Sequence, residues 1–323
     1  MARPPSRPPA PKKPAPPKRR RSEPPWRRRE EESTKPRRGG GGPPREDGER
    51  GPQSKNAVGY RLDIEYQGTQ YSGWQIQQNA RTVAGVLEGA LRDAGCEIVE
   101  LQGAGRTDAG VHALHQVAHL RLRRGIEPEP LRRDLNDRLP GDVHVLRIGA
   151  VPRGFHARHD AVERSYLYQI SRRRTAFGRR FVWWVRDRLD LERLRSAATA
   201  LEGRHDFRRF CVAAAEQTST LVQIEGVEIV EAGDLILLRL RASHFLWRMV
   251  RRTVGTLVEA GTGRLPVEEI AALLDPGAPD RDPGPAQWTA PPSGLFLERV
   301  RYAGDPPIGE LRPVVEVAAF RGR

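Results

Sequence analysis

One carboxylate stands in a setting that suits chemistry, within the segment Gly105-Arg106-Thr107-Asp108-Ala109-Gly110-Val111-His112. The glycines on both sides of Asp108 allow the loop backbone to approach a ligand closely. A carboxylate placed in this way can act as a nucleophile or assist the abstraction of a proton. An aspartate in an isolated turn more often bonds to its own backbone. The loop alone therefore leaves a structural role and a catalytic role open.

Other segments carry aromatic and basic residues that could accompany Asp108. In chain order they are Tyr71 to Gln77, Phe155 to Arg158, Arg164 to Tyr168, His205 to Phe207, Phe245 with Met249 to Arg251, and Gly294 to Leu297. In this order and spacing, and together with the octet around Asp108, they resemble the tRNA pseudouridine synthase A (TruA) family. The resemblance runs from about Tyr60 to Tyr302 and leaves the N-terminal segment outside.

The resemblance implies an activity and a set of site residues. The expected activity is isomerisation of uridine to pseudouridine in the anticodon stem-loop of tRNA, by a homodimer without a cofactor. Asp108 matches the catalytic nucleophile of the family, and Arg106 matches the arginine that helps hold the RNA with the target base flipped out. Tyr166 matches the tyrosine that packs against that base, Arg251 the basic residue that pairs with the carboxylate, and Leu297 an apolar wall of the uracil pocket.

The chemistry of this reaction suits these residue types. Isomerisation detaches uracil from the sugar carbon C1′, turns the ring and rejoins it through C5, so no electron carrier is needed. An arginine beside a carboxylate favours the ionised form by its opposite charge. A base inside a stacked stem must leave the stack to react, and an aromatic ring offers it a flat face. Without the family motifs, Tyr166 and Leu297 would fit core positions as well, and Trp74 could either stack on RNA or pack in the core.

Two departures from the family pattern bear on the choice of RNA. No arginine follows Thr218-Ser219-Thr220, where the family usually has a Thr-X-Arg element, and Cys211 stands where a polar or basic residue is more usual. The same chemistry at a different RNA site therefore stays open. A non-catalytic RNA-binding protein on the same scaffold is a further alternative, although such a copy would be expected to lose the carboxylate first.

Three histidines, His112, His115 and His119, raise the question of a metal site. On one helix they would share a face. From His115 onward, however, the residues alternate as in a strand, which places His112 in the preceding loop. No neighbouring glutamate completes a metalloprotease-like motif. We therefore expect neither a metal site nor a cofactor.

The positive charge is concentrated at the N-terminus. The 323 residues carry a formal net charge of +14, and residues 1–55 hold 17 Lys or Arg against 7 Asp or Glu. This segment also holds half of the 28 prolines, and it buries too little apolar surface to offset the entropy of ordering. We expect residues 1–57 to form a disordered basic extension. It either holds RNA phosphates loosely or has no specific role.

Cysteine content and hydropathy bear on the compartment. Cys96 and Cys211 are too few for a disulfide framework or a cysteine-based zinc site, so a cytosolic location is the default expectation. The longest apolar runs are far shorter than a membrane span, and the N-terminus lacks the apolar core of a secretory signal. No membrane partner is expected.

Alternating and helical patterns divide the body into elements. Strands are predicted at 60–66, 97–102, 115–123, 143–150, 164–171, 181–185, 221–230, 235–241 and 295–302. Helices are predicted after Thr82, at 130–139, from Asp190 to Gly203, at 244–260 and at 267–274. This mixture favours an α+β fold with antiparallel sheets. We expect two similar subdomains, 58–158 and 159–304, flanked by helices with the active-site cleft between them, and then a tail at 305–323.

Overall fold

The structure is a computed structural model that describes residues 57–213 and 219–317. Residues 1–56 of the expected basic extension lie outside the described residues. The strands are β1 (Val58–Tyr66), β2 (Ile98–Gly103), β3 (His112–Leu122), β4 (Val143–Val151), β5 (Ala161–Ser171), β6 (Trp183–Trp184), β7 (Gly203–Asp206), β8 (Leu221–Ala232), β9 (Leu235–Ala242) and β10 (Leu295–Tyr302). The helices are α2 (Val83–Asp93), α3 (Pro128–Arg138), α4 (Leu191–Thr199), α5 (Met249–Gly261) and α6 (Glu269–Leu274), with 3-10 turns at Gly68–Gln70, Arg208–Phe210 and Pro292–Gly294.

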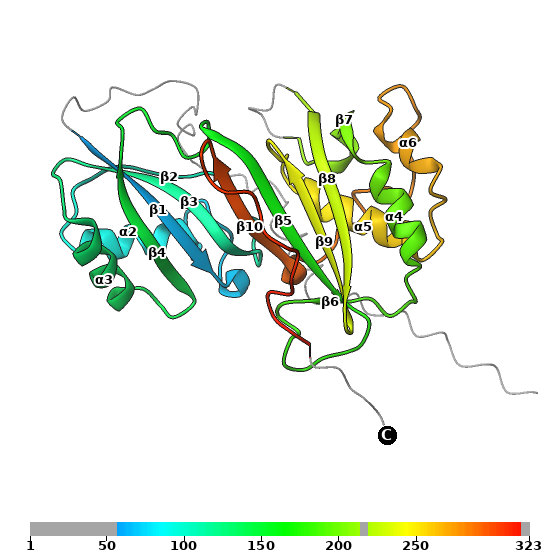
Figure 1. Ribbon diagram of the computed structural model, residues 1–323, viewed down its shortest axis with the longest axis horizontal. Coiled ribbons are helices and arrows are strands. Elements are labelled where there is room, and N and C mark those ends of the chain that lie inside the picture. Colours follow the sequence, from blue (N-terminus) through cyan, green and yellow to red (C-terminus); the bar gives the residue numbers. More distant parts are fainter. Residues whose placement is uncertain (1–56, 214–218, 318–323) are drawn as a thin grey trace, which may run out of the picture. The chain divides into compact units, whose positions relative to one another are not determined.

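One sheet runs through the described body (Figure 1). Its strand order is β4-β1-β3-β10-β5-β9-β8-β7, with β2 paired to β3 and β6 paired to β5. Most pairs are antiparallel, whereas β10 runs parallel to β3 and β6 runs parallel to β5. The predicted α+β class with largely antiparallel pairing is confirmed. The strands of the two halves of the chain meet where β10 lies beside β3.

The helices lie against the sheet in two groups (Figure 1). Helices α2 and α3 lie beside β1 to β4, and α4, α5 and α6 lie beside β7 to β9. The helix predicted after Thr82 is confirmed as α2, in which Val83, Leu87 and Leu91 are buried and the hydroxyl of Thr82 accepts a hydrogen bond from Gly85 N. Within the described ranges, none of the helices has the length and apolar character needed to cross a membrane.

Two helix limits differ from the prediction by four residues or more. Helix α5 begins at Met249 rather than at residue 244, because Arg248 has a left-handed backbone (φ 63°) that is incompatible with an α-helix. Phe245 keeps the apolar spacing of a helix but packs against the core from the preceding turn. Helix α4 ends at Thr199, and Gly203 is instead the first residue of β7.

The segment after β10 packs against the sheet up to Val317. Val317 and Leu311 are buried in a small apolar cluster that also contains Leu167 of β5. The backbone N–H of Val314 donates a hydrogen bond to the side-chain oxygen of Gln169, at 2.7 Å. The residues that follow the last strand thus cover part of one face of the sheet. The main core cluster, which includes the helices, lies on the other face.

Candidate active site

The loop that carries the candidate carboxylate joins β2 to β3 and is held by the segment before α2. Trp74 N donates to Thr107 O at 3.1 Å, and Gly110 N donates to Tyr71 O at 3.2 Å. Gly73 has φ 97°, and a Cβ at this position would come within 2.5 Å of Thr107 O. Only glycine fits such a backbone and such a close approach. The Tyr-Ser-Gly-Trp segment therefore positions the loop.

Buried polar side chains support the same loop from the sheet. The hydroxyls of Tyr66 and Thr107 lie 2.8 Å apart, and the amide of Gln116 donates to Gly105 O at 2.8 Å. Burial raises the pKa of Tyr66 well above its usual range, although the hydrogen bonds that its hydroxyl makes with Thr107 and with the Gln116 amide oppose the shift. Tyr66 therefore keeps its proton and can donate it to Thr107.

The two carboxylate oxygens of Asp108 have different partners. Oδ2 lies 3.3 Å from Nη1 of Arg251, and Oδ1 accepts a hydrogen bond from Nε1 of Trp247 at 3.1 Å. The side chain of Asp108 is 17% exposed, whereas that of Arg251 is only 2% exposed. The carboxylate thus reaches solvent while its cationic partner stays inside the protein.

Arg251 reaches the loop from the first turn of α5. Its Nε donates to Ala290 O at 2.7 Å, and Ala290 N donates back to the carbonyl oxygen of Arg251 at 3.0 Å. One turn further along α5, a Cβ at Gly255 would lie 1.6 Å from Trp288 O. The absence of a side chain at Gly255 therefore lets the segment around Ala290 lie against the helix and fix the Arg251 guanidinium.

Tyr166 and Leu297 are register partners on the neighbouring strands β5 and β10. Leu297 is fully buried, and the Tyr166 ring packs edge-on against Phe245, with centroids 5.1 Å apart. Burial is the main reason why the pKa of Tyr166 lies above its usual range. The nearby Tyr66 and the negative charge of Asp108 raise this pKa further. A Cβ at Gly105 would lie 4.0 Å from the Tyr166 hydroxyl, so this neutral hydroxyl lies beside the loop.

Arg106 and Trp74 differ sharply in exposure. Arg106 lies on the exposed side of the loop, two residues before Asp108. Trp74 is 2% exposed, and a Cβ at Gly103 would come within 2.6 Å of its ring. Trp74 is therefore a core residue that fills the space left by a glycine, and the stacking role considered for it does not apply.

Trp247 is a site residue that the sequence prediction missed. Residues 244–260 were expected to be one helix, so Trp247 was treated as an ordinary helix position. In the structure it lies in the turn between β9 and α5, where its indole is 48% exposed and bonded to Asp108. A large aromatic residue between the family positions Phe245 and Arg251 was the available signal.

Arg164 is a second residue that the prediction missed. It is 8% exposed, and it donates hydrogen bonds to Ala104 O, at 3.3 Å, and to Ser243 O. Ala104 opens the loop that carries Asp108, and Ser243 opens the turn that carries Trp247. Arg164 therefore ties the two segments together. Its signal in the sequence was its place as the first residue of Arg164 to Tyr168, one of the segments that carry the family resemblance.

The three histidines point to separate partners. His112 is the first residue of β3, so the expectation that it lies in the loop is wrong. His115 Nε2 lies 3.5 Å from a carboxylate oxygen of Asp63, and His119 Nε2 lies 3.3 Å from one of Glu100. In the part of the chain that the structure describes, no group of three or more His, Cys, Asp or Glu residues could hold a metal ion.

His112 should make the fold sensitive to acid. Its Nδ1 accepts a hydrogen bond from Gly68 N and its Nε2 lies 2.9 Å from Arg180 O, which fits a neutral ring with the proton on Nε2. Burial lowers the pKa of His112 from 6.5 to about 4. The unfolded chain therefore takes up the proton first. The stability present above pH 6.5 is lost as the pH falls towards 4, by about 3 kcal/mol in total.

Urea unfolding at a series of pH values between 7 and 4 measures this loss. We expect the free energy of unfolding of the wild-type chain to fall more steeply over this window than that of His112→Gln. The control is His144→Gln, because His144 is exposed and should leave the slope unchanged. Equal slopes in all three proteins would rule out His112 as the source of the acid sensitivity.

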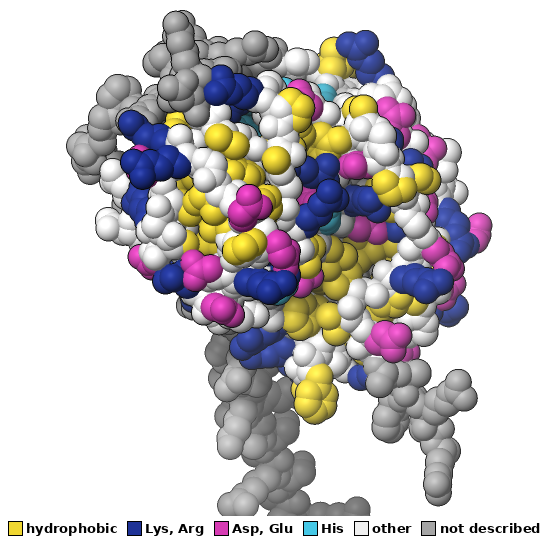
Figure 2. Space-filling view, turned by 60° about the vertical axis from the view of Figure 1, so that its left-hand side comes forward, with side chains coloured by type: hydrophobic (Ala, Val, Ile, Leu, Met, Phe, Trp, Pro, Cys, Tyr) yellow, Lys and Arg dark blue, Asp and Glu magenta, His cyan; other side chains and the backbone are white. Residues whose placement is uncertain are grey.

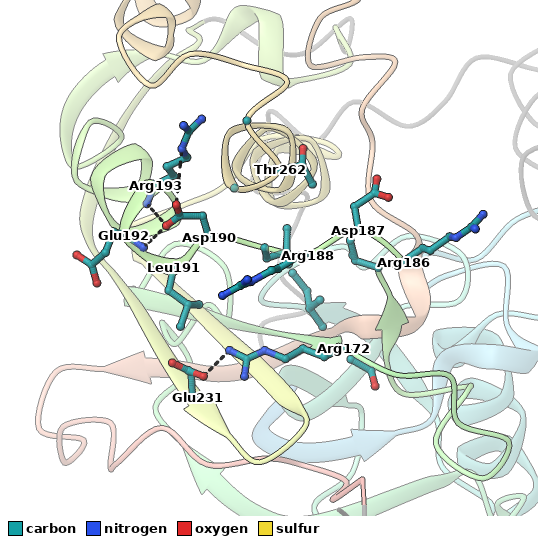
Figure 3. Close-up of a pocket in the computed structure, with 16 residues that line it drawn as sticks. Arg172, Arg186, Asp187, Arg188, Asp190, Leu191, Glu192, Arg193, Glu231 and Thr262 are labelled. Atoms are coloured by element: carbon teal, nitrogen blue, oxygen red, sulfur yellow. Dashed lines mark hydrogen bonds and ion pairs between the residues drawn. The ribbon is translucent and has the colours of Figure 1, made fainter. Parts of the chain in front are cut away.

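A large hollow among the described residues has a lining that does not include Asp108 (Figure 3). Its volume is about 1200 Å³, and the end of β5, the segment 185–193 and the end of α5 line it. Some of its charges are used internally, since Arg172 pairs with Glu231 and Asp190 accepts hydrogen bonds at the start of α4. Size alone would select this hollow, but its lining offers no nucleophile beside a base. We place the site at Asp108 because buried and exposed functional groups converge there.

The surface charge of the described body is uneven. Residues 56–323 carry 38 Lys or Arg against 34 Asp or Glu, a small excess for the body as a whole. Figure 2 nevertheless shows Lys and Arg side chains gathered near the middle of one face, beside hydrophobic side chains. Such a concentration of positive charge attracts polyanions more than the net charge suggests.

Comparisons with known proteins give one consistent result. The family described as tRNA pseudouridine synthase matches residues 64–160 and 197–303. A protein of Agrobacterium fabrum named tRNA pseudouridine synthase A is 43% identical over 249 residues, which cover 75% of this chain and 92% of that protein. The proteins of the same name from Citrifermentans bemidjiense and Allorhizobium ampelinum are 40% and 41% identical, over 75% and 79% of this chain and 96% and 97% of their own lengths. The matched ranges contain Asp108, Arg106, Arg251 and Leu297, and Tyr166 lies between them.

Proposed function

Because this chain belongs to the tRNA pseudouridine synthase family, it isomerises uridine to pseudouridine in tRNA, and we propose that Asp108 is the nucleophile of that reaction. The observation that carries the proposal is the setting of its carboxylate. It is partly exposed, it lies on a loop fixed on both sides, and the buried guanidinium of Arg251 lies 3.3 Å from one of its oxygens.

The reaction needs a nucleophile and a place for the base to turn. The bond between N1 of uracil and C1′ breaks, the ring rotates, and a bond forms between C5 and C1′, after which C5 loses its proton and N1 gains one. A carboxylate that attacks the sugar or the ring forms a covalent link that is later released. Arg251 orients the Asp108 carboxylate from the protein interior, so the attacking oxygen can face the RNA.

The flipped uracil is proposed to lie against Tyr166 and Leu297. Their position on neighbouring strands beside the loop supports this assignment, and the reaction requires the base to leave its stack. Arg106 is proposed to hold the displaced nucleotide. Its exposed place two residues before Asp108 suits a guanidinium that binds phosphate or fills the vacated stack.

The target and the assembly are also proposals. The anticodon arm of tRNA is the expected target from the family resemblance, and a homodimer in the cytosol is the expected form. Two-fold dimers are the commonest assembly, and a dimer would join two modestly basic bodies into one surface for tRNA. The proposed subdomains, 58–158 and 159–304, would each contribute to one site, because Asp108 belongs to the first and Arg251 to the second.

Mapping pseudouridine in tRNA tests this function. In cells that lack the protein, pseudouridine should disappear from the anticodon arm of tRNA, and the wild-type gene should restore it. Pseudouridine at other positions should stay unchanged and serves as the internal control. A loss confined to another arm would contradict the proposed target, and no loss in any tRNA would contradict the proposed function.

A further inference from the structure

One oxygen of Asp108 has a hydrogen-bond partner that faces solvent. Oδ1 accepts a hydrogen bond from the Trp247 indole at 3.1 Å, and Trp247 is 48% exposed. The opposite side of the carboxylate contacts Arg251, which is buried. The exposed indole therefore lies directly beside the candidate carboxylate.

Arg248 lies over the same ring. Its guanidinium carbon is 5.6 Å from the centroid of the Trp247 indole, and among the described residues its buried Nε has no hydrogen-bond partner. Arg248 also has a left-handed backbone, at φ 63°, which it shares with Asn79 alone among the described non-glycine residues. Strain of this kind concentrates at sites that hold ligands.

The turn that presents these two side chains is firmly held. Val212 N donates to Trp247 O at 3.0 Å, and Met249 N donates to Leu246 O at 3.0 Å. Phe245, earlier in the turn, packs against Tyr166. The exposed indole and the guanidinium above it are therefore presented by a fixed backbone next to the proposed base pocket.

The charge around the turn favours an anion. Arg248 directly precedes α5, and Arg251 and Arg252 lie in the first turn of that helix. Arg252 donates to the carbonyl oxygen of Cys211 rather than to a carboxylate. Burial lowers the pKa of Arg252, and the positive charges of Arg248 and Arg251 lower it further. A phosphodiester beside Arg248 would relieve this concentration of positive charge.

We propose that Trp247 and Arg248 form a nucleotide subsite next to Asp108, in which the base that flanks the target uridine stacks on the Trp247 indole and its phosphodiester binds the Arg248 guanidinium. Aromatic rings accept any base on their face, and arginine binds phosphate through its planar fork. The stacked base leaves the hydrogen bond from Nε1 to Asp108 in place. The subsite rests on the proposed role of Asp108, and it makes Trp247 a binding residue for the nucleotide beside the target uridine.

Binding is measured separately from turnover, in full-length protein carrying Asp108→Asn and with an unmodified tRNA transcript as the probe. Trp247→Leu should weaken binding by about 10-fold, and Trp247→Phe should keep most of the affinity, because a ring still stacks. Trp184→Leu is the matched control, since Trp184 is also exposed, at 39%, and lies outside the site. A second transcript carries abasic nucleotides on both sides of the target uridine. The protein that keeps Trp247 should bind this transcript about 10-fold more weakly than the intact one, whereas the protein with Trp247→Leu should bind both transcripts with equal affinity.

Arg248→Asn tests the phosphate contact. Asparagine tolerates the left-handed backbone, so the variant should fold, while the slope of log affinity against log salt should fall by about one. The subsite would be overturned if Trp247→Leu kept the full affinity for tRNA, or if Trp184→Leu lost as much affinity. It would also be overturned if the loss from Trp247→Leu and the loss from the abasic transcript were additive, or if Arg248→Asn left the salt slope unchanged. Because these readouts need no turnover, they remain valid if the wild-type protein fails to make pseudouridine, which would count against the proposed function instead.

Discussion

Asp108→Asn is expected to abolish turnover and to leave tRNA binding nearly intact. The substitution keeps the size of the side chain and its ability to accept the hydrogen bond from Trp247, but it removes the negative charge and the nucleophile. Loss of a nucleophile costs at least about 10⁴-fold in rate in enzymes that depend on one. Release of tritium from C5 of uracil in labelled tRNA measures turnover, and retention of labelled tRNA on a filter measures binding.

The control for this prediction is Asp137→Asn, which removes the same charge from an exposed position on α3. It should release tritium at the wild-type rate. The variant must be free of wild-type protein, because the expected loss of rate is about 10⁴-fold. If Asp108→Asn still released tritium at a rate within about 10-fold of wild type, another group would carry the reaction.

Arg251→Met is expected to reduce turnover by about 100-fold with little change in the affinity for tRNA. Arg251 is 2% exposed and contacts Asp108 from inside the protein, so it does not reach the RNA. Its loss removes both the charge partner and the group that fixes the carboxylate, and removal of one oriented charged group from an active site costs about 10²- to 10³-fold. Steady-state kinetics with tRNA should therefore show a lower kcat and a nearly constant KM.

Arg252→Met is the matched variant on the neighbouring helix position. Arg252 is also largely buried and donates to a backbone carbonyl, so its replacement should destabilise the fold to a comparable extent. It should leave most of the turnover, because the structure gives it no bond to Asp108. A loss of kcat in Arg252→Met as large as that in Arg251→Met would mean that general destabilisation, not the ion pair, explains the effect.

Local patterns in the sequence predict single elements well and their limits less well. The cap at Thr82 and the spacing of Val83, Leu87 and Leu91 are sufficient to predict α2, because both signals are local. The start of α5 could not be predicted from apolar spacing, since Phe245 has the right spacing for a helix but lies before Arg248. A left-handed arginine leaves no mark in a hydrophobicity pattern.

The convergence of the site depends on pairing that no local pattern encodes. Asp108 and Arg251 are 143 positions apart in the chain. They meet because the strands of the two halves form one sheet, in which β10 lies parallel to β3. The family resemblance supplied their association in advance. It did not supply Trp247 or Arg164, whose roles depend on the turn between β9 and α5 and on carbonyl groups that only the folded chain presents.

The central claim is that the carboxylate of Asp108 carries the isomerisation of uridine in tRNA. Its most direct test is to incubate purified wild-type protein and Asp108→Asn separately with an unmodified tRNA transcript, then digest the RNA and measure its nucleosides. We predict that wild-type protein converts uridine into an equal amount of pseudouridine, and that Asp108→Asn forms none above the no-enzyme control. Equal pseudouridine with both proteins, or none with the wild-type protein, would contradict the claim.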